Sequence, residues 1–286
     1  MIGSASGEIV KLHVKAQEGS KWILEHHEID IPLNASEAPE ELQVGNSIEV
    51  FLFVDRRGNL SATTQIPTIQ KGTYGWARVI KVSEKEGAFV DIGTSKEVQV
   101  KADDLPKIKD LWPANGDHLY ITLRTDKDGE LFGRLATEDR VEELYIDAPT
   151  TLFNQNLQAR PYRLLPIGTF LLSVPENYRI FVHQSERAEE PRLGQDLTVR
   201  VIDTKEDGSL NGSLLPRNHE RLEDDAESIF RYINDVGGKM PFTDKSNPDE
   251  IQEMFTMSKA AFKRALGKLM KEGKIVQKDG WTELKM

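Results

Sequence analysis

A hairpin pattern that occurs three times in the chain is the feature that most constrains its fold. The three segments begin at Val44, Asn115 and Leu193. Each has a glycine followed by an alternating apolar strand, a polar turn closed by a second glycine, and another strand. The two glycines are 13, 13 and 14 residues apart. Asp-Gly, which closes the second and third turns, is a strong hairpin signal because glycine adopts positive φ without strain. The chain is therefore predicted to contain three copies of one β-rich unit.

Strand-like segments also precede each hairpin. They occupy residues 7–33 in the first unit, 75–105 in the second and 162–186 in the third. Each unit then has about five short strands with alternating faces and no long helix. Such a unit is typical of a small closed barrel, because closure leaves no free sheet edge.

Two of these units contain a characteristic motif: the second has "GAFVDIG" at residues 87–93, and the third has "FVHQSE" at residues 181–186. These motifs resemble the S-one RNA-binding domain, an OB-fold module. The second unit has "VQVKADDL" at the place of the histidine motif, and the third has "IGTFLL" at the place of the phenylalanine motif. The first unit keeps only the hairpin. The resemblance implies three tandem OB-fold barrels.

The periodicity changes after Pro216 and predicts a helical domain. Leu222, Ala226, Ile229, Phe230 and Ile233 are spaced as on one face of a helix that ends at Gly237. A second helix is expected after the cap Asn247 and a third after the cap Ser258. The buried face expected for the third helix is Ala261, Phe262, Ala265, Leu266, Leu269 and Met270. A hairpin closed by Asp279-Gly280 follows. This order is typical of a winged helix, whose third helix is the recognition element.

The distribution of charge favours this last domain as a binding surface. The net charge of −10 opposes binding to phosphate, but a local patch can differ from the total. Residues 217–257 have five basic and ten acidic side chains, whereas residues 258–286 have eight basic and three acidic ones. The candidate RNA-binding residues are Lys259, Lys263, Arg264, Lys268, Lys271, Lys274 and Lys278. The alternative is a solvated helix face that binds nothing.

Four segments of the chain are especially characteristic: "DLPKIKDLWPANGDHLY", "AEEPRLG", "DKSNPDEI" and "MSKAAFKRALGKL". Through them the whole chain resembles the conserved virulence factor B family. It implies a mainly β fold of three S-one-like five-stranded barrels with a C-terminal α+β winged helix. The expected limits are 1–66, 67–138 and 161–216 for the barrels, 139–160 for a linker and 217–286 for the winged helix. The family implies RNA binding by both kinds of domain and a role in regulating gene expression.

The S-one resemblance also assigns candidate contacts in the barrels. OB barrels bind single strands by stacking bases on aromatic rings beside cations. When the binding positions of the S-one pattern are carried onto this chain, they fall on Phe89, Lys101 and Asp126 in the second unit. In the third unit they fall on Phe170, His183 and Lys205. Phe89 and Phe170 could instead lie in the core, as apolar strand residues usually do. Trp76, Trp112 and Trp281 are expected to pack rather than to bind.

The sequence lacks the signatures of several other classes. It has no Cys, which excludes disulfides, Cys-ligated zinc and thiol catalysis. It has no phosphate-binding loop and no clustered histidines, so we expect neither an enzyme nor a cofactor or metal. No segment has the about 20 apolar residues of a membrane span, and we expect a cytoplasmic protein. The prediction is a non-catalytic post-transcriptional regulator that binds single-stranded RNA. DNA binding through the winged helix and a protein-interaction scaffold remain alternatives, and the oligomeric state is open.

Overall fold

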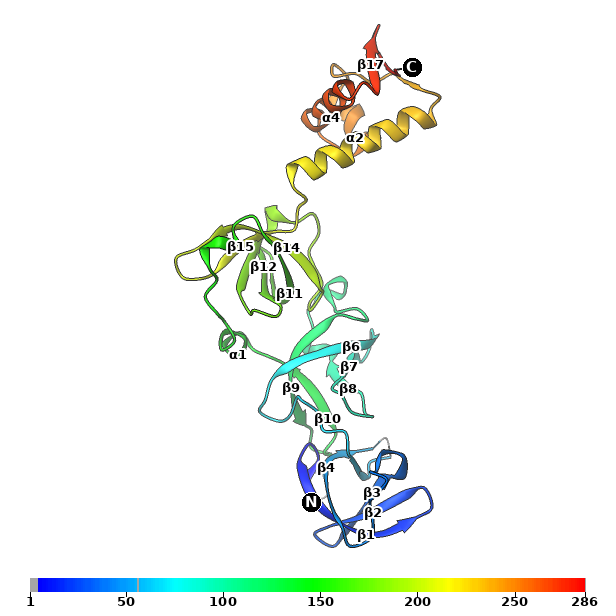
Figure 1. The fold of residues 1–286 in the computed structure, drawn as a ribbon, viewed down its shortest axis with the longest axis vertical. Coiled ribbons are helices and arrows are strands. Elements are labelled where there is room, and N and C mark those ends of the chain that lie inside the picture. The colour runs from blue at the N-terminus through cyan, green and yellow to red at the C-terminus, as the bar shows by residue number, and fades with distance from the viewer. Residues whose placement is uncertain (1–4, 56, 286) are drawn as a thin grey trace. The chain divides into compact units, whose positions relative to one another are not determined.

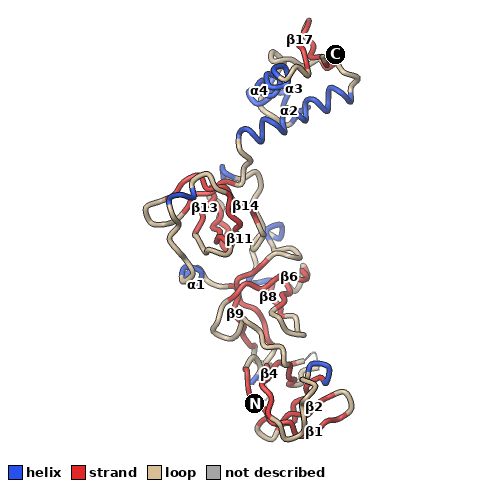
Figure 2. The backbone as a smooth tube through the Cα atoms, in the orientation of Figure 1, coloured by secondary structure: helices blue, strands red, loops and turns tan. Residues whose placement is uncertain are grey.

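Three closed β-barrels are followed by a small helical domain in the computed structural model, which describes residues 5–55 and 57–285 (Figures 1 and 2). Barrel 1 consists of β1 (Ile9–Glu18), β2 (Lys21–His26), β3 (Ile29–Asn34), β4 (Ser47–Val54) and β5 (Leu60–Thr63). Barrel 2 consists of β6 (Gly75–Ser83), β7 (Gly87–Asp91), β8 (Val98–Lys101), β9 (His118–Thr125) and β10 (Leu131–Leu135). Barrel 3 consists of β11 (Asn156–Leu165), β12 (Gly168–Ser173), β13 (Arg179–His183), β14 (Leu197–Thr204) and β15 (Leu210–Ser213).

The three barrels have one topology. In each, the first strand pairs with the second, the second with the third, the third with the fifth, and the fourth lies between the fifth and the first. The predicted hairpins join the fourth and fifth strands, and all six repeat glycines have positive φ. The predicted fold of three five-stranded barrels is confirmed.

Each barrel also has the same two irregularities. The first strand shifts register between Val14 and Ala16, between Val79 and Lys81, and between Pro161 and Arg163. Such a bulge bends a strand and increases its twist, which helps a short sheet to close. A 3₁₀ helix follows the third strand in every barrel: η2 (Ala35–Glu37), η3 (Ala102–Asp104) and η6 (Gln184–Glu186). These recurrences show three copies of one unit.

The connection between barrels 2 and 3 is shorter than the expected linker, because β11 already begins at Asn156. Leu157 is half-buried and Ala159 is buried, while Gln158 between them is exposed. This alternation contains only one large apolar side chain, so the strand pattern at this position is weak. The connection contains α1 (Glu138–Glu142), fixed by the buried Val141, and η5 (Thr150–Leu152).

The loop before β14 docks barrel 3 on barrel 2. Gly194 N–H donates to the Pro161 carbonyl (2.8 Å), and the Gly194 carbonyl accepts from His118 N–H (2.8 Å). Leu193 is buried in the core of barrel 2. Arg192 donates to the Asp117 carboxylate, at 3.1 Å through Nε and 3.3 Å through Nη2. Backbone, apolar and ionic contacts therefore join the two barrels.

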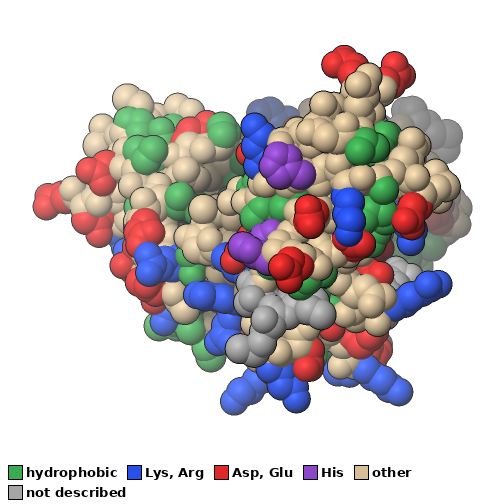
Figure 3. All heavy atoms as spheres, turned by 90° about the horizontal axis from the view of Figure 1, so that it is seen from below, with side chains coloured by type: hydrophobic (Ala, Val, Ile, Leu, Met, Phe, Trp, Pro, Cys, Tyr) green, Lys and Arg blue, Asp and Glu red, His purple; other side chains and the backbone are tan. Residues whose placement is uncertain are grey.

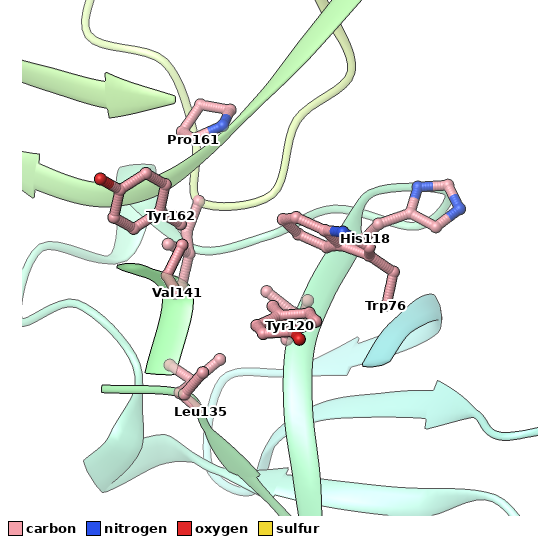
Figure 4. A pocket seen from close by; sticks show the side chains of 10 residues that line it. Trp76, His118, Tyr120, Leu135, Val141, Pro161 and Tyr162 are labelled. Carbon is pink, nitrogen blue, oxygen red and sulfur yellow. The ribbon is translucent and has the colours of Figure 1, made fainter. Parts of the chain in front are cut away.

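A small cavity of about 40 Å³ lies beside this loop, between Trp76 and Tyr120 of barrel 2 and Tyr162 of barrel 3 (Figure 4). His118 also lines it. Burial, reinforced by the nearby Arg160 guanidinium, lowers the pKa of His118. The imidazole is therefore neutral at physiological pH, although Asp196 Oδ2 lies 3.2 Å from its Nδ1.

The C-terminal domain has the expected winged-helix order: α2 (Asn218–Asp235), β16 (Lys239–Met240), α3 (Pro248–Phe255), α4 (Lys259–Lys271), β17 (Ile275–Lys278) and β18 (Trp281–Leu284). The strands form a sheet in the order β16-β18-β17. Asn247 caps α3 by accepting from Asp249 N–H (2.9 Å), and Ser258 caps α4 by accepting from Ala261 N–H (3.2 Å). Both caps were predicted.

The core of this domain is formed by the apolar faces of the helices. Ile229 and Ile233 of α2 pack with Phe262, Leu266 and Leu269 of α4. The expectation that Met270 joins them is wrong, since its side chain is 39% exposed. At 100° per residue, position 270 lies beyond the buried stripe and beside Lys263. Of the helices that the structure describes, none is long and apolar enough to cross a membrane.

The contact at Gly194 predicts that alanine substitution there destabilises the protein more than at Gly116, the first glycine of the second hairpin segment. A Cβ at Gly194 would lie 2.1 Å from the His118 carbonyl oxygen, whereas a Cβ at Gly116 would meet nothing within 4 Å. Both residues have positive φ. Gly116→Ala should cost about 1–2 kcal/mol from backbone strain alone. Gly194→Ala should cost about 1–3 kcal/mol more from the added clash. Denaturant unfolding measures both, and equal losses would contradict the docking contact.

Candidate nucleic-acid interface

Cross-strand pairing places five outward-facing side chains of barrel 2 in one line. Lys81 pairs with Phe89, and Phe89 pairs with Gln99. Gln99 lies beside Phe132 across the parallel pair β8–β10, and Phe132 pairs with Arg124. Residues directly opposite in a sheet share one face. We call these five residues the barrel 2 row.

The two phenylalanines of the row have their rings on the surface. Ala88 and Val90 are buried on either side of the half-buried Phe89, so the Phe89 side chain points outward. Lys81 Nζ lies 5.2 Å from the centre of the Phe89 ring. Lys101 Nζ lies 4.4 Å from the centre of the Phe132 ring. Two rings with adjacent cations can stack bases and bind phosphates.

The equivalent positions of barrel 3 form a second line, the barrel 3 row. It runs from Arg163 through Phe170, Phe181 and Asn211 to Asp203. The Phe170 and Phe181 ring centres are 4.9 Å apart. Arg163 lies 5.8 Å from the Phe170 ring, and Asn211 Nδ2 donates to Asp203 Oδ2 (3.3 Å). Phe170 is therefore on the outer face as well.

Further aromatic and basic groups surround Phe170. The Arg179 guanidinium lies 5.0 Å from the Phe170 ring and 5.6 Å from the Tyr145 ring. The Tyr162 ring lies 6.4 Å from Phe170, and its hydroxyl is hydrogen-bonded to that of Tyr145. Burial is the main cause that raises the pKa of Tyr162, so its phenol stays protonated. Arg163 forms an ion pair with Glu138 of α1.

His183 is exposed at the end of β13, with its ring 6.4 Å from that of Phe181. Its Nδ1 accepts from Ser185 N–H (3.2 Å) and lies 2.8 Å from Ser185 Oγ, so His183 caps η6. Nε2 makes no hydrogen bond to any residue that the structure describes. The residue at the equivalent N-cap position is Asn34 in barrel 1 and Lys101 in barrel 2. His183 therefore has a structural role as the cap of η6, and its ring borders the barrel 3 row.

Asp126 and Lys205 lie in the turns that join the fourth and fifth strands. Asp126 Oδ1 accepts from Asp128 N–H and Glu130 N–H, each at 2.9 Å. That oxygen is engaged in the turn, as Asp55 Oδ1 is in barrel 1. Lys205 has an exposed side chain, and its N–H donates to the Ser209 carbonyl (2.9 Å). A contact of either residue with RNA stays a prediction.

Barrel 1 has different residues at the same five positions: Ala16, Ile23, Pro32, Ser61 and Phe53. Only one of them is aromatic and none is charged. The hollow beside them, about 340 Å³, is lined by two acidic residues, Glu37 and Asp55, and by one basic residue, Lys21. Lys96 of barrel 2 already lies 5.8 Å from the Phe53 ring. Figure 3, seen from below Figure 1, shows acidic and basic side chains interspersed. Barrel 1 therefore lacks a stacking row.

The basic candidates of the winged helix differ in how far their charge is compensated. Lys263, Arg264 and Lys271 are exposed on α4, and Lys278 is exposed on β17. None of these four forms an ion pair with a described residue. Lys259 is half-buried, and its Nζ lies 3.5 Å from the Lys245 carbonyl.

Acidic side chains neutralise the other two candidates. Lys268 Nζ lies 3.1 Å from Glu223 and 3.7 Å from Glu272. Lys274 Nζ lies 2.8 Å from Glu272. The uncompensated charge therefore lies on the outer face of α4 and on the wing.

Trp281, which was expected to pack rather than to bind, lies on the surface of the wing. It is 39% exposed, and Lys239 Nζ lies 4.8 Å from its ring. The alternation of β18 gives the reason, because the next residue, Thr282, is the buried one. Trp112 does pack: it is buried, and its Nε1 donates to the Pro106 carbonyl (2.6 Å). Trp76 is half-buried beside the small cavity.

Four families match consecutive parts of the chain. Residues 6–65 match the family described as "S1 domain" and residues 74–134 match "CvfB first S1-like domain". Residues 141–216 match "Virulence regulatory factor CvfB, second domain", and residues 227–284 match "CvfB-like winged helix domain". The matches follow the three barrels and the helical domain in order.

Similar proteins cover nearly the whole chain. A Staphylococcus saprophyticus protein named conserved virulence factor B is 46% identical over 282 residues, 96% of this chain and 92% of the relative. Its Staphylococcus aureus namesake is 44% identical over 290 residues, 97% of this chain and 96% of the relative. A Streptococcus pneumoniae crystal structure, described as a multidomain protein with nucleic acid binding domains, is 39% identical with a TM-score of 0.70. That match covers 98% of this chain and 99% of the other.

The cap formed by His183 predicts how substitutions there affect stability. His183→Ala should cost about 0.5–2 kcal/mol, because Ser185 N–H loses its acceptor. His183→Asn should restore most of this loss, since Asn34 caps barrel 1 through its side chain. Lys101→Ala is the matched control, because Lys101 makes no side-chain cap. Thermal unfolding measures all three, and equal losses for Ala and Asn at position 183 would contradict the capping role.

Proposed function

Since the chain belongs to the conserved virulence factor B family, we propose that it is a non-catalytic RNA-binding protein that regulates gene expression after transcription. Its S-one-like and winged-helix domains are folds that occur in nucleic-acid binding. The word "regulatory" in the description of the family that residues 141–216 match supports a regulatory role. Transcripts and ribosomes meet in the cytoplasm, which is the compartment that this proposal implies.

The observation that carries the proposal is the barrel 2 row. It presents the rings of Phe89 and Phe132 with Lys81, Lys101 and Arg124 beside them. Rings on a sheet surface can stack only on bases that are not already paired and stacked in a duplex. This arrangement therefore favours a single strand as the ligand.

The winged helix supplies a second attraction. Lys263, Arg264 and Lys271 of α4 can contact phosphates, which contributes affinity but no base preference. Trp281 beside Lys239 adds a ring that can stack on a base. We propose that the barrels select a single strand and that the winged helix strengthens binding through the backbone.

The basic face of α4 also favours a second candidate function, a DNA-binding regulator. A recognition helix with exposed cations can lie in the major groove of duplex DNA. In that case the barrel rows would contribute nothing to affinity. A protein-interaction scaffold is the other alternative, and it requires no salt-dependent binding of nucleic acid.

The two proposed surfaces predict different effects on the binding of single-stranded RNA by the full-length protein. Phe89→Ala with Phe132→Ala should weaken binding about 30-fold or more, because each of the two stacked bases contributes about 1–3 kcal/mol. The salt dependence should stay unchanged. Replacement of Lys263, Arg264 and Lys271 by Ala should instead flatten the slope of log K against log salt by about 2, at about 0.7 per lost phosphate contact.

Matched controls separate these effects from nonspecific damage. Phe153→Ala removes a phenylalanine that is 64% exposed and lies outside both rows. Lys11→Ala removes an exposed charge of barrel 1. Fluorescence anisotropy with a fluorescein-labelled oligouridine measures the affinities. The proposal fails if the wild-type protein does not bind, or if the double phenylalanine variant binds as tightly as Phe153→Ala.

A further inference from the structure

A basic groove adjoins one end of the barrel 2 row. Its volume is about 550 Å³, and its walls include Tyr74, Arg124, Phe132, Arg134 and Arg140. Phe132 and Arg124 belong both to the row and to the groove. The two are therefore continuous, and a ligand stacked on Phe132 reaches the groove without leaving the protein surface.

The local sequence explains why three arginines meet here. Gly133 is buried, so the flanking Phe132 and Arg134 of β10 both point outward. Arg124 of β9 lies directly opposite Phe132. Arg140 comes from α1, outside the barrel, and the buried Val141 beside it fixes that short helix. The groove is thus formed before any ligand binds.

The charges around the groove leave it basic. Arg124 forms no ion pair with a described residue. Arg134 lies 3.9 Å from Asp104, and Arg140 lies 2.7 Å from Glu143 and 3.7 Å from Asp139.

These ion pairs do not prevent the arginines from binding an anion. The side chains of Arg134 and Arg140 are exposed, and exposed ion pairs contribute only about 0–1 kcal/mol. A phosphate can therefore replace the carboxylates as their partner. Asp139 is the one acidic residue among those that line the groove.

An aromatic ring provides a surface next to these guanidinium groups. Tyr74 lies with its ring 6.0 Å from the Arg140 guanidinium. The Tyr74 ring also packs against Tyr120, 5.9 Å between ring centres, which holds it in place. A base or a ribose can lie on such a fixed ring while arginines bind the adjacent phosphates.

The helix that supplies Arg140 also contacts barrel 3. Glu138, at the start of α1, forms an ion pair with Arg163, the first residue of the barrel 3 row. One side of the groove therefore continues from the barrel 2 row, and α1 connects its other side to the barrel 3 row.

We propose that this groove binds the sugar-phosphate backbone of a single RNA strand where the strand leaves the barrel 2 row towards barrel 3. Arg124 and Arg140 bind consecutive phosphates, and Tyr74 supports the intervening nucleotide. The inference rests on the proposed function and adds to it a phosphate-binding groove that extends the stacking row beyond Arg124 and Phe132. It makes barrels 2 and 3 one continuous binding surface rather than two independent ones.

The test is the salt dependence of RNA binding by the full-length protein, measured with an oligouridine of about 15 nucleotides, long enough to pass beyond one barrel. Arg124→Ala with Arg140→Ala should weaken binding about 10-fold and flatten the slope by about 1.4, at about 0.7 per lost phosphate contact. Arg124→Lys with Arg140→Lys keeps both charges and should keep the slope. Lys11→Ala with Lys107→Ala removes two exposed charges elsewhere and is the matched control.

The possible results separate this inference from the proposed function. One result is that Arg124→Ala with Arg140→Ala gives the same affinity and slope as the control Lys11→Ala with Lys107→Ala, while Phe89→Ala with Phe132→Ala weakens binding. In that case the groove proposal is wrong and the stacking row stands. If the wild-type protein does not bind the oligonucleotide, the proposed function itself is wrong. Unchanged thermal unfolding of the arginine variants shows that any loss is a loss of contact.

Discussion

The parallel contact between the third and fifth strands is the constraint on which the binding surface of each barrel depends. This contact closes the barrel, and a small residue of the fifth strand lies at it. Ala62 and Gly133 pair across it in barrels 1 and 2, and Gly212 directly follows the paired Asn211 in barrel 3. A Cβ on Gly133 would lie 2.9 Å from Ile121 and 3.0 Å from Val100 of the third strand. One on Gly212 would lie 2.4 Å from Val199 and 2.8 Å from Ile180 of the third strand. A larger side chain at either position would collide with these core side chains. Closure then fixes which outward residues become neighbours, and it places Phe132 beside Gln99.

The same closed frame carries three different outer surfaces. At the position after the bulge, barrel 1 has Ala16, where barrels 2 and 3 have Lys81 and Arg163. On the second strand, barrel 1 has Ile23, where the others have Phe89 and Phe170. The inward residues stay apolar throughout because they form the cores. Binding capacity therefore varies between barrels without any change of fold.

The sequence predicts the architecture well because its strongest signals are local. Turn glycines, strand alternation and helix caps act over a few residues. The six repeat glycines and the caps Asn247 and Ser258 are where they were expected. The outward positions of Phe89 and Phe170 also follow from alternation. The short strand start at Asn156 was missed because it has little apolar surface. The exposure of Met270 and Trp281 follows from the helical angle of position 270 and from the alternation of β18, which places Thr282 inside.

The partners of Phe89 and Phe170 could not be predicted in the same way. Lys81, Phe132, Arg163 and Phe181 reach the rows only through bulges and cross-strand register, which apolar periodicity does not specify. Arg140 comes from a five-residue helix whose position is set by one buried valine.

The most direct test of the account compares single-stranded RNA with duplex DNA of the same sequence in filter binding over a series of salt concentrations. The account predicts tighter binding of the single-stranded RNA at every salt concentration, because only unpaired bases can stack on the barrel rows. Tighter binding of the duplex DNA would contradict it and would assign the affinity to the winged helix alone.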